Sequence, residues 1–162
     1  MLTSRISFKN FKITKKKSPL VKKKLLALVK EKNEIIKSLT KDYKNNFNKK
    51  TLKKFKNTLE YRVIGMGGSS LGAQAIYDFL NFKIKKKFFF VDNLKKNYLK
   101  KNKNHTNLVI SKSGNTIETI VNANLLIKKK DRNIFITENK KNYLHILAER
   151  LKADIIHHND YI

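Results

Sequence analysis

The pattern of apolar and polar residues divides the chain into two parts. In residues 61–162, short apolar runs alternate with longer segments whose apolar residues recur at helical spacing. The short runs are rich in β-branched and aromatic residues and lack strict alternation, which is typical of strands buried on both faces of a parallel sheet. The five predicted strands are "YRVIGM", "KFFFVD", "NLVIS", "NIFIT" and "ADIIHH".

The segments between these runs are long enough for helices that connect parallel strands. Their apolar spacing predicts four helices, over residues 70–80, 94–100, 116–129 and 141–151. Strands that alternate with helices in this way indicate an α/β fold. We therefore predict a doubly wound, five-stranded parallel sheet, for which we take the strand order 2-1-3-4-5, a common order in this fold class.

Residues 1–60 predict a helical segment that precedes this domain of residues 61–162. Ser18 suits an N-cap, Pro19 suits the first helical position, and the apolar residues of "SPLVKKKLLALVKEKNEIIKSL" follow helical spacing. That stretch predicts an amphipathic helix. Residues 41–60 predict a turn and a second short helix that is too polar to contribute to a core.

Composition adds exclusions to this picture. A chain of 162 residues can bury a substantial single core, and the sequence contains no cysteine for a disulfide or a thiolate metal site. No apolar stretch approaches the roughly 20 residues of a membrane span, and "MLTSRISFKN" lacks the apolar centre of a secretory signal. The four histidines show no metal-ligand spacing. We expect a soluble cytoplasmic protein without a metal.

A formal net charge of +26 raises the question of a nucleic-acid partner. Only four of the 38 lysine and arginine residues are arginines, the side chain that groove and phosphate contacts favour. The lysine runs are spread along the chain, and dispersed charge of this kind usually marks solvated surfaces. The composition therefore predicts no nucleic-acid partner.

Two polar loops follow the first and third predicted strands. The first is "GMGGSSLG", residues 65–72, and the second is "SKSGNT", residues 111–116. In doubly wound sheets, ligands bind beyond the carboxyl ends of the strands where the strand order reverses. With the order 2-1-3-4-5 the reversal lies between these two strands, so the two loops are expected to be neighbours at a ligand site.

The glycine-rich loop fits known nucleotide motifs incompletely. Gly65 and Gly67 match the start of G-x-G-x-x-G, but Ser70 stands where a third glycine or alanine packs the helix. No glycine is followed by the lysine and hydroxyl residue of a Walker loop. The glycines instead suggest close approach of the backbone to a ligand, with Ser69 supplying a hydroxyl. The alternative is a tight turn that requires glycine for its own conformation.

The second loop has the composition of an anion cradle. A turn that leads into a helix presents unpaired backbone N–H groups, and the helix dipole favours negative charge there. The hydroxyls of Ser111, Ser113 and Thr116 can donate to phosphate oxygens, while Gly114 permits a sharp turn. Without an arginine cluster or a carboxylate array for Mg²⁺, the loop suits a monophosphate.

An ordinary helix cap is the alternative interpretation of this loop. Asn115 followed by Glu118 forms a pair that resembles a capping box, in which the two side chains satisfy the first N–H groups of a helix. Under this interpretation Glu118 is a capping residue and not a catalytic base.

Together the two loops resemble the sugar isomerase (SIS) domain and, more narrowly, the glucose-6-phosphate isomerase family. The resemblance rests on "GMGGSSLGAQAI" and, more specifically, on "VISKSGNTIETI". It implies a phosphorylated-sugar ligand, a hexose 6-phosphate, with Ser111, Ser113 and Thr116 around the phosphate and Gly68 and Ser69 lining the sugar. The family interconverts glucose 6-phosphate and fructose 6-phosphate through an enediol, with no metal or organic cofactor, and forms homodimers.

The chain departs from the family pattern in its catalytic groups. The family places an enediolate-stabilising arginine just after the strand predicted at "ADIIHH", and its glutamate base, ring-opening histidine and late lysine in a second SIS domain. No residue of this chain matches those motifs, so none is assigned a catalytic role. We expect the phosphate-binding N-terminal part of such an isomerase, truncated and inactive alone; the alternative is a stand-alone regulatory module that binds a sugar phosphate.

Overall fold

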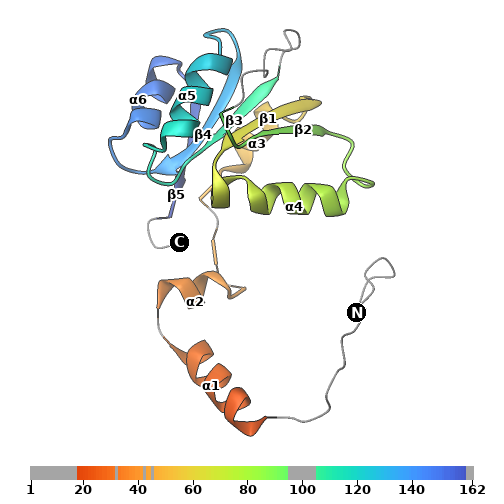
Figure 1. Ribbon diagram of the computed structural model, residues 1–162, viewed down its shortest axis with the longest axis vertical. Coiled ribbons are helices and arrows are strands. Elements are labelled where there is room, and N and C mark those ends of the chain that lie inside the picture. Colours follow the sequence, from red (N-terminus) through yellow and green to blue (C-terminus); the bar gives the residue numbers. More distant parts are fainter. Residues whose placement is uncertain (1–17, 32, 42, 45, 95–104, 160–162) are drawn as a thin grey trace. The chain divides into compact units, whose positions relative to one another are not determined.

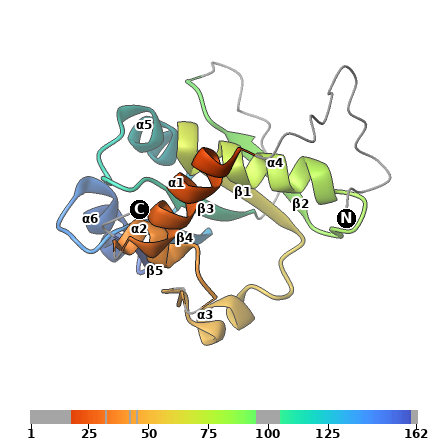
Figure 2. The same ribbon diagram turned by 90° about the horizontal axis from the view of Figure 1, so that it is seen from below.

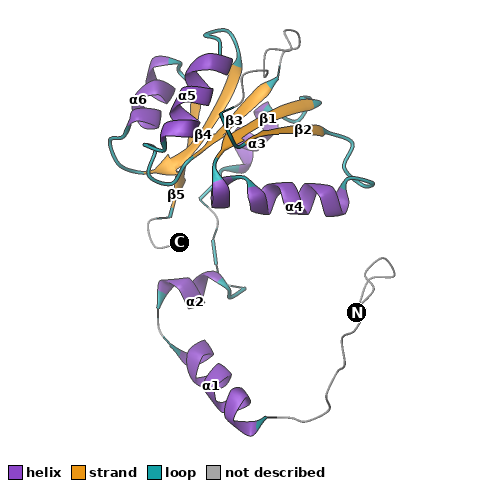
Figure 3. Ribbon diagram, viewed as in Figure 1, coloured by secondary structure: helices purple, strands orange, loops and turns teal. Residues whose placement is uncertain are grey.

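The computed structural model of the chain forms two compact units, residues 1–43 and 44–162. The elements of both units are labelled in Figure 1 and coloured by type in Figure 3. The structure describes residues 18–31, 33–41, 43–44, 46–94 and 105–159. No helix among these residues is both long enough and apolar enough to cross a membrane.

The first unit contains two short helices in place of the predicted amphipathic helix over residues 18–39. Helix α1 spans Pro19–Lys30, with the Ser18 hydroxyl accepting from the N–H of Val21, and α2 spans Glu34–Ser38. The continuous helix is wrong because Glu31 adopts an extended conformation and Asn33 starts a new helix, its Oδ1 accepting from the N–H of Ile36 at 2.8 Å. Asparagine side chains compete for backbone groups in this way and favour caps over helix interiors.

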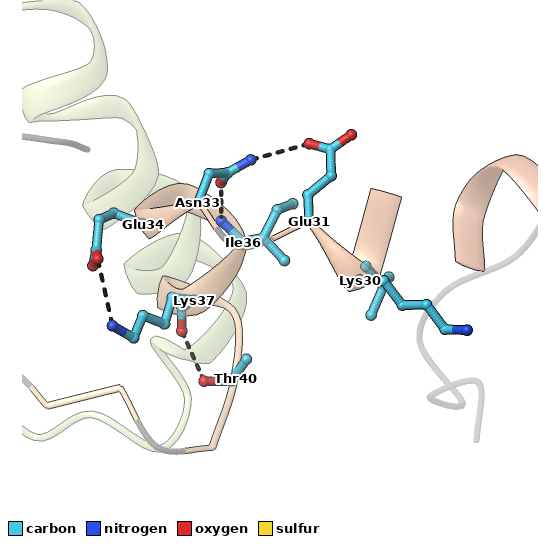
Figure 4. Close-up of a pocket in the computed structure, with 8 residues that line it drawn as sticks. Lys30, Glu31, Asn33, Glu34, Ile36, Lys37 and Thr40 are labelled. Carbon is cyan, nitrogen blue, oxygen red and sulfur yellow. Dashed lines mark hydrogen bonds and ion pairs between the residues drawn. The ribbon is translucent and has the colours of Figure 1, made fainter. Parts of the chain in front are cut away.

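A cavity of about 370 Å³ lies between α1 and α2 (Figure 4). Apart from Lys30, its charged and amide side chains are paired, since Asn33 donates to Glu31 at 3.1 Å and Lys37 lies 3.4 Å from Glu34. The Thr40 hydroxyl donates to the carbonyl oxygen of Lys37 at 2.8 Å. These pairs stabilise the turn between the two helices and leave the cavity without a group of unpaired ligand-binding side chains among its described residues.

The second unit is built on the predicted sheet. Five parallel strands lie in the order β2-β1-β3-β4-β5, which confirms the predicted α/β topology. The strands are β1 (Glu60–Gly65), β2 (Lys87–Val91), β3 (Thr106–Ile110), β4 (Arg132–Glu138) and β5 (Asp154–His158). The helices are α3 (Lys49–Lys54), the 3₁₀ helix η1 (Gly67–Ser69), α4 (Leu71–Leu80), α5 (Ile117–Leu126) and α6 (Tyr143–Arg150).

Helices α5 and α6 lie beside each other, α5 against β1 and β3 and α6 against β4 and β5, and α4 lies along β1 and β2 (Figures 1 and 2). The core forms between the sheet and the α5–α6 pair. Ile64, Val109 and Phe135 from three adjacent strands are fully buried there with Ala123 of α5 and Leu144 of α6. Because side chains alternate along a strand, the residues directly before and after each of these three face the other side of the sheet.

Three of the four helices predicted within residues 61–162 agree with the structure except at their ends. Residues 70–80 and 141–151 contain α4 and α6, whereas the helix predicted to residue 129 ends at Leu126. Ile127 is extended, and Arg62 Nη1 of β1 donates to the Leu126 carbonyl at 3.0 Å. Burial lowers the pKa of Arg62, and the charge of Asp131 acts in the opposite direction. The helix predicted over 94–100 falls, apart from Leu94, outside the described residues.

Residues 44–60 belong to the sheet unit and contribute to its core. Phe55, which follows α3, is only 7% exposed, and its carbonyl oxygen accepts from the Tyr61 hydroxyl at 2.8 Å. The hydroxyls of Thr58 and Thr106 lie 3.1 Å apart. The expectation that this segment is too polar for a core role is therefore wrong. A polar segment contributes to the core here through the single side chain of Phe55, which is buried near the start of β1.

Candidate functional site

The two polar loops meet at the carboxyl ends of β1 and β3, which are adjacent strands. Gly65 ends β1 and pairs in register with Ile110 at the end of β3. A Cβ atom at Gly65 would lie 3.0 Å from the Ile110 carbonyl oxygen and 3.2 Å from Cβ of Ser69. The strands and their following loops are thus packed closely enough that any larger residue at this position would have to displace its neighbours. The predicted juxtaposition of the two loops is confirmed.

The first loop makes a single 3₁₀ turn before α4. Gly67 has φ +54°, a conformation that side chains other than glycine rarely adopt. The buried Ser70 hydroxyl donates to the Gly67 carbonyl at 3.3 Å and closes the turn. Gly68 is exposed, with open space around the position of a Cβ atom, and Ser69 is half-buried. The turn therefore presents Gly68 and Ser69 at the open end of the sheet.

The three hydroxyls of the second loop have different surroundings. Ser111 is only 2% exposed, and its Oγ accepts from the Gly114 N–H at 3.2 Å and lies 3.0 Å from Thr116 Oγ1. Ser113 is exposed, and its Oγ accepts from the N–H of Asn115 at 3.3 Å. Thr116 is half-buried. Ser111 and Thr116 are thus brought together, with Ser111 inside the loop and Ser113 at its surface.

The predicted capping box is wrong. Thr116, and not Asn115, is the N-cap of α5, which makes Glu118 the second residue of the helix. The Asn115 side chain points elsewhere in the structure, because its Oδ1 accepts from the N–H of Tyr143 at 3.1 Å. No side chain makes a capping hydrogen bond at the start of α5.

The helices that follow the two loops differ in their capping from the other α-helices of the described chain. A side-chain oxygen accepts from a first-turn N–H in α1, α2, α3 and α6, where the caps are Ser18, Asn33, Asn48 and Asn142. Helices α4 and α5 have no such bond. These are the two helices that begin at the carboxyl ends of β1 and β3. Their first N–H groups, which a helix leaves without internal partners, are therefore available to an anion.

Asn142 was missed by the sequence analysis. It is buried beneath the second loop, caps α6 and packs against Gly114. Asn142 is the second residue of the helix predicted over residues 141–151, and α6 in fact begins at Tyr143. Asparagine near the start of a helical pattern is a recognisable cap signal, so its capping role could have been predicted. Its contact with the loop could not, because it joins residues 28 positions apart in the chain.

The four histidine side chains have partners outside both loops, and His158 Nδ1 lies 2.7 Å from the Asn159 carbonyl oxygen. His145 and His157 stack with ring centroids 6.0 Å apart, and His105 Nδ1 lies 3.5 Å from Glu60 Oε2. Over the part of the chain that the structure describes, no three histidine, aspartate or glutamate side chains are grouped to hold a metal ion.

Comparisons with known proteins agree with this architecture. The profile of the family described as Phosphoglucose isomerase matches residues 12–151. A glucose-6-phosphate isomerase of Methanocaldococcus jannaschii is 37% identical over 70% of this chain and 30% of its own length. One from Mycoplasmoides gallisepticum is 36% identical over 72% of this chain and 32% of its own. This chain thus spans about a third of those relatives.

Among solved structures, the crystal structure of a hypothetical protein from Thermus thermophilus has the same fold. It superposes with a TM-score of 0.61 at 20% sequence identity. The match covers 70% of this chain and 31% of the other.

Proposed function

The chain belongs to the phosphoglucose isomerase family, and from that premise we propose that its second loop binds the phosphate group of a hexose 6-phosphate. The observation that supports the proposal most directly is the missing side-chain cap on α4 and α5. Unpaired N–H groups and the positive end of the helix dipole attract a phosphate, and hydroxyl-bearing loops add donors. Both features meet where β1 and β3 end.

The surroundings of each residue suggest its role in this site. We assign direct contacts with phosphate to Ser113 and Thr116, whose side chains are exposed or half-buried. Ser111 acts from inside the loop, where its hydroxyl bonds hold Gly114 and Thr116 in place. Gly68 and Ser69 line the sugar, since the open space beside Gly68 lets a ligand approach the backbone closely.

This chain covers about a third of the length of its relatives. We extend the proposal to a protein of the relatives' full length. That protein interconverts glucose 6-phosphate and fructose 6-phosphate, acts in the cytoplasm and forms a homodimer. The reaction needs a base near the sugar carbon and a cation at the developing oxyanion. Glu118 lies in the first turn of α5, and Glu138 pairs with Lys140 at 3.1 Å, so neither is assigned as the base.

Removing the Ser113 or the Thr116 hydroxyl tests the phosphate contacts. Because hydrogen bonds to a charged group contribute about 1.5–3 kcal/mol, we expect Ser113→Ala and Thr116→Ala each to weaken glucose 6-phosphate binding about tenfold or more. Isothermal titration calorimetry measures the dissociation constants. Ser38→Ala, which removes a hydroxyl in the first unit, should bind like the parent chain. Unchanged affinity in both loop variants would remove this assignment.

We expect the chain alone to bind glucose 6-phosphate without converting it. The reason is that the family's base and cationic groups have no assigned counterpart among its residues. Formation of fructose 6-phosphate is followed in a coupled assay with purified protein. Turnover that disappears in Ser113→Ala would show that the chain is a complete enzyme, or that two copies complete the site together.

A further inference from the structure

The start of α6 is joined to the second loop through its first two N–H groups. Tyr143 donates to Asn115 Oδ1 and Leu144 to the Gly114 carbonyl oxygen, both at 3.1 Å. His145 donates to Asn142 Oδ1 at 2.9 Å. The first-turn donors of α6 are therefore all engaged, two of them by the loop and the third by the cap. In this respect α6 is the opposite of α5, whose first turn has no side-chain cap.

The other end of the Asn142 side chain reaches the loop through Thr137. Asn142 Nδ2 donates to Thr137 Oγ1 at 3.0 Å, and Thr137 Oγ1 donates onward to the Lys112 carbonyl oxygen at 3.3 Å. The N–H of Glu138 donates to the same carbonyl at 3.0 Å. Thr137 is fully buried and Asn142 nearly so. A buried chain of bonds thus fixes the backbone of Lys112, next to Ser113.

Asn142 also determines the space available to the loop. A Cβ atom built on Gly114 would overlap Oδ1, Cγ and Nδ2 of the Asn142 side chain. Gly114 therefore packs its Cα directly against the amide, in a left-handed conformation with φ +66°. The loop thus packs against this side chain, and the asparagine limits the positions that the turn at Gly114 can adopt.

We infer that Asn142 is the positioning residue of the phosphate-binding loop. It holds Lys112 through Thr137 and supports Gly114 by direct packing, and so fixes Ser113 between them without itself contacting the ligand. A loop held in its bound conformation has less conformational entropy to lose when phosphate binds. The inference rests on the proposed function, because it concerns the same site.

Asn142→Ser separates positioning from helix capping. Serine is as good an N-cap as asparagine, so α6 keeps a cap acceptor, while the bond to Thr137 and the support under Gly114 are lost. Asn48→Ser is the matched control, since Asn48 caps α3 with its Oδ1 at 2.8 Å from the Lys50 nitrogen and lies on an exposed turn. Both variants are made in the full 162-residue chain.

We expect Asn142→Ser to raise the dissociation constants for glucose 6-phosphate and for inorganic phosphate about tenfold, and Asn48→Ser to leave both within twofold. The chain has five glycines, so the Gly114 amide can be assigned in ¹H–¹⁵N spectra. Its signal should broaden in Asn142→Ser, because the loop then moves between conformations, and stay unchanged in Asn48→Ser. A purely stabilising role would change the unfolding midpoint and leave the Gly114 line width and the affinity unchanged.

Parent-like affinity in Asn142→Ser, or an equal loss of affinity in Asn48→Ser, overturns the inference. Failure of the proposed function is recognised separately, because then the parent chain binds neither ligand. In that case line broadening of the Gly114 signal, which reports motion of the loop, decides whether Asn142 holds the loop in one conformation. Broadening in Asn142→Ser supports that role, and an unbroadened signal refutes it.

Discussion

Replacing Phe135 by alanine is expected to lower the free energy of unfolding of the sheet unit by about 3–5 kcal/mol. Phe135 lies at the centre of β4, is fully buried, and packs in the cluster with Ile64, Val109 and Leu144. Alanine would remove a large apolar surface from the core and leave a cavity that the surrounding strands cannot close. Since a domain is stable by only about 5–15 kcal/mol, this single change removes a large share of the stability.

Urea unfolding followed by far-ultraviolet circular dichroism measures the effect, because the chain has no tryptophan to report by fluorescence. Phe79→Ala is the matched control. Phe79 is 51% exposed on α4, so its truncation should change the free energy of unfolding by less than about 1 kcal/mol. Equal losses in the two variants would mean that the core is not centred between the sheet and the α5–α6 pair.

The strands were predictable because their signal is local. In β4 the run "NIFIT" combines β-branched and aromatic residues over the length of a strand, and the residue at its centre, Phe135, is fully buried. The strand order 2-1-3-4-5 is a common order of doubly wound sheets, and the neighbouring position of the two polar loops followed from it. The local pattern thus predicted the strands, and a general rule of the fold class supplied their order.

Features that depend on competition between backbone and side chain were less predictable. The apolar spacing continues through Glu31 and Asn33, yet the helix stops there because Asn33 caps a new helix. Phe55 is similar, since a single aromatic residue in a lysine-rich segment has no periodic pattern around it. Its burial depends on where β1 begins, which is a property of the folded unit.

The candidate site shows the same difference between local and long-range features. Its residues were proposed from the hydroxyls and glycines of the two loops, whereas their hydrogen-bond partners were not predicted. The capping box at Asn115 and Glu118 obeys a local rule, but Asn115 instead pairs with Tyr143, which is brought close only when β4 and α6 pack beside the loop. Long-range partners of this kind decide which hydroxyls remain available for a ligand.

The second large effect is expected for Gly114→Ala, which should lower the free energy of unfolding by about 3 kcal/mol and abolish measurable phosphate binding. The left-handed φ of +66° costs alanine about 1–2 kcal/mol. The new methyl group also displaces the Asn142 side chain that it would overlap, which removes a helix cap worth about 1 kcal/mol. Because Asn142 is bonded to buried Thr137, its displacement also leaves polar groups unpaired.

Two other glycines separate these contributions in the same urea experiment. Gly67 has φ +54° with nothing within 4 Å of a Cβ atom, so Gly67→Ala should show the cost of the backbone conformation alone. Gly72 lies in α4 with equally open surroundings and no left-handed φ. Gly72→Ala should therefore raise stability by about 0.5–1 kcal/mol, the usual gain for alanine in a helix.

The collision with Asn142 is isolated by a double-mutant cycle. In the Asn142→Ser background the side chain that blocks the new methyl group is shorter, so Gly114→Ala should cost at least about 1 kcal/mol less than in the parent chain. Additive costs would mean that the loop moves away from Asn142 without resistance. Because the positioning role requires a loop that cannot move freely from this side chain, the coupling energy measures how firmly Gly114 is held against Asn142.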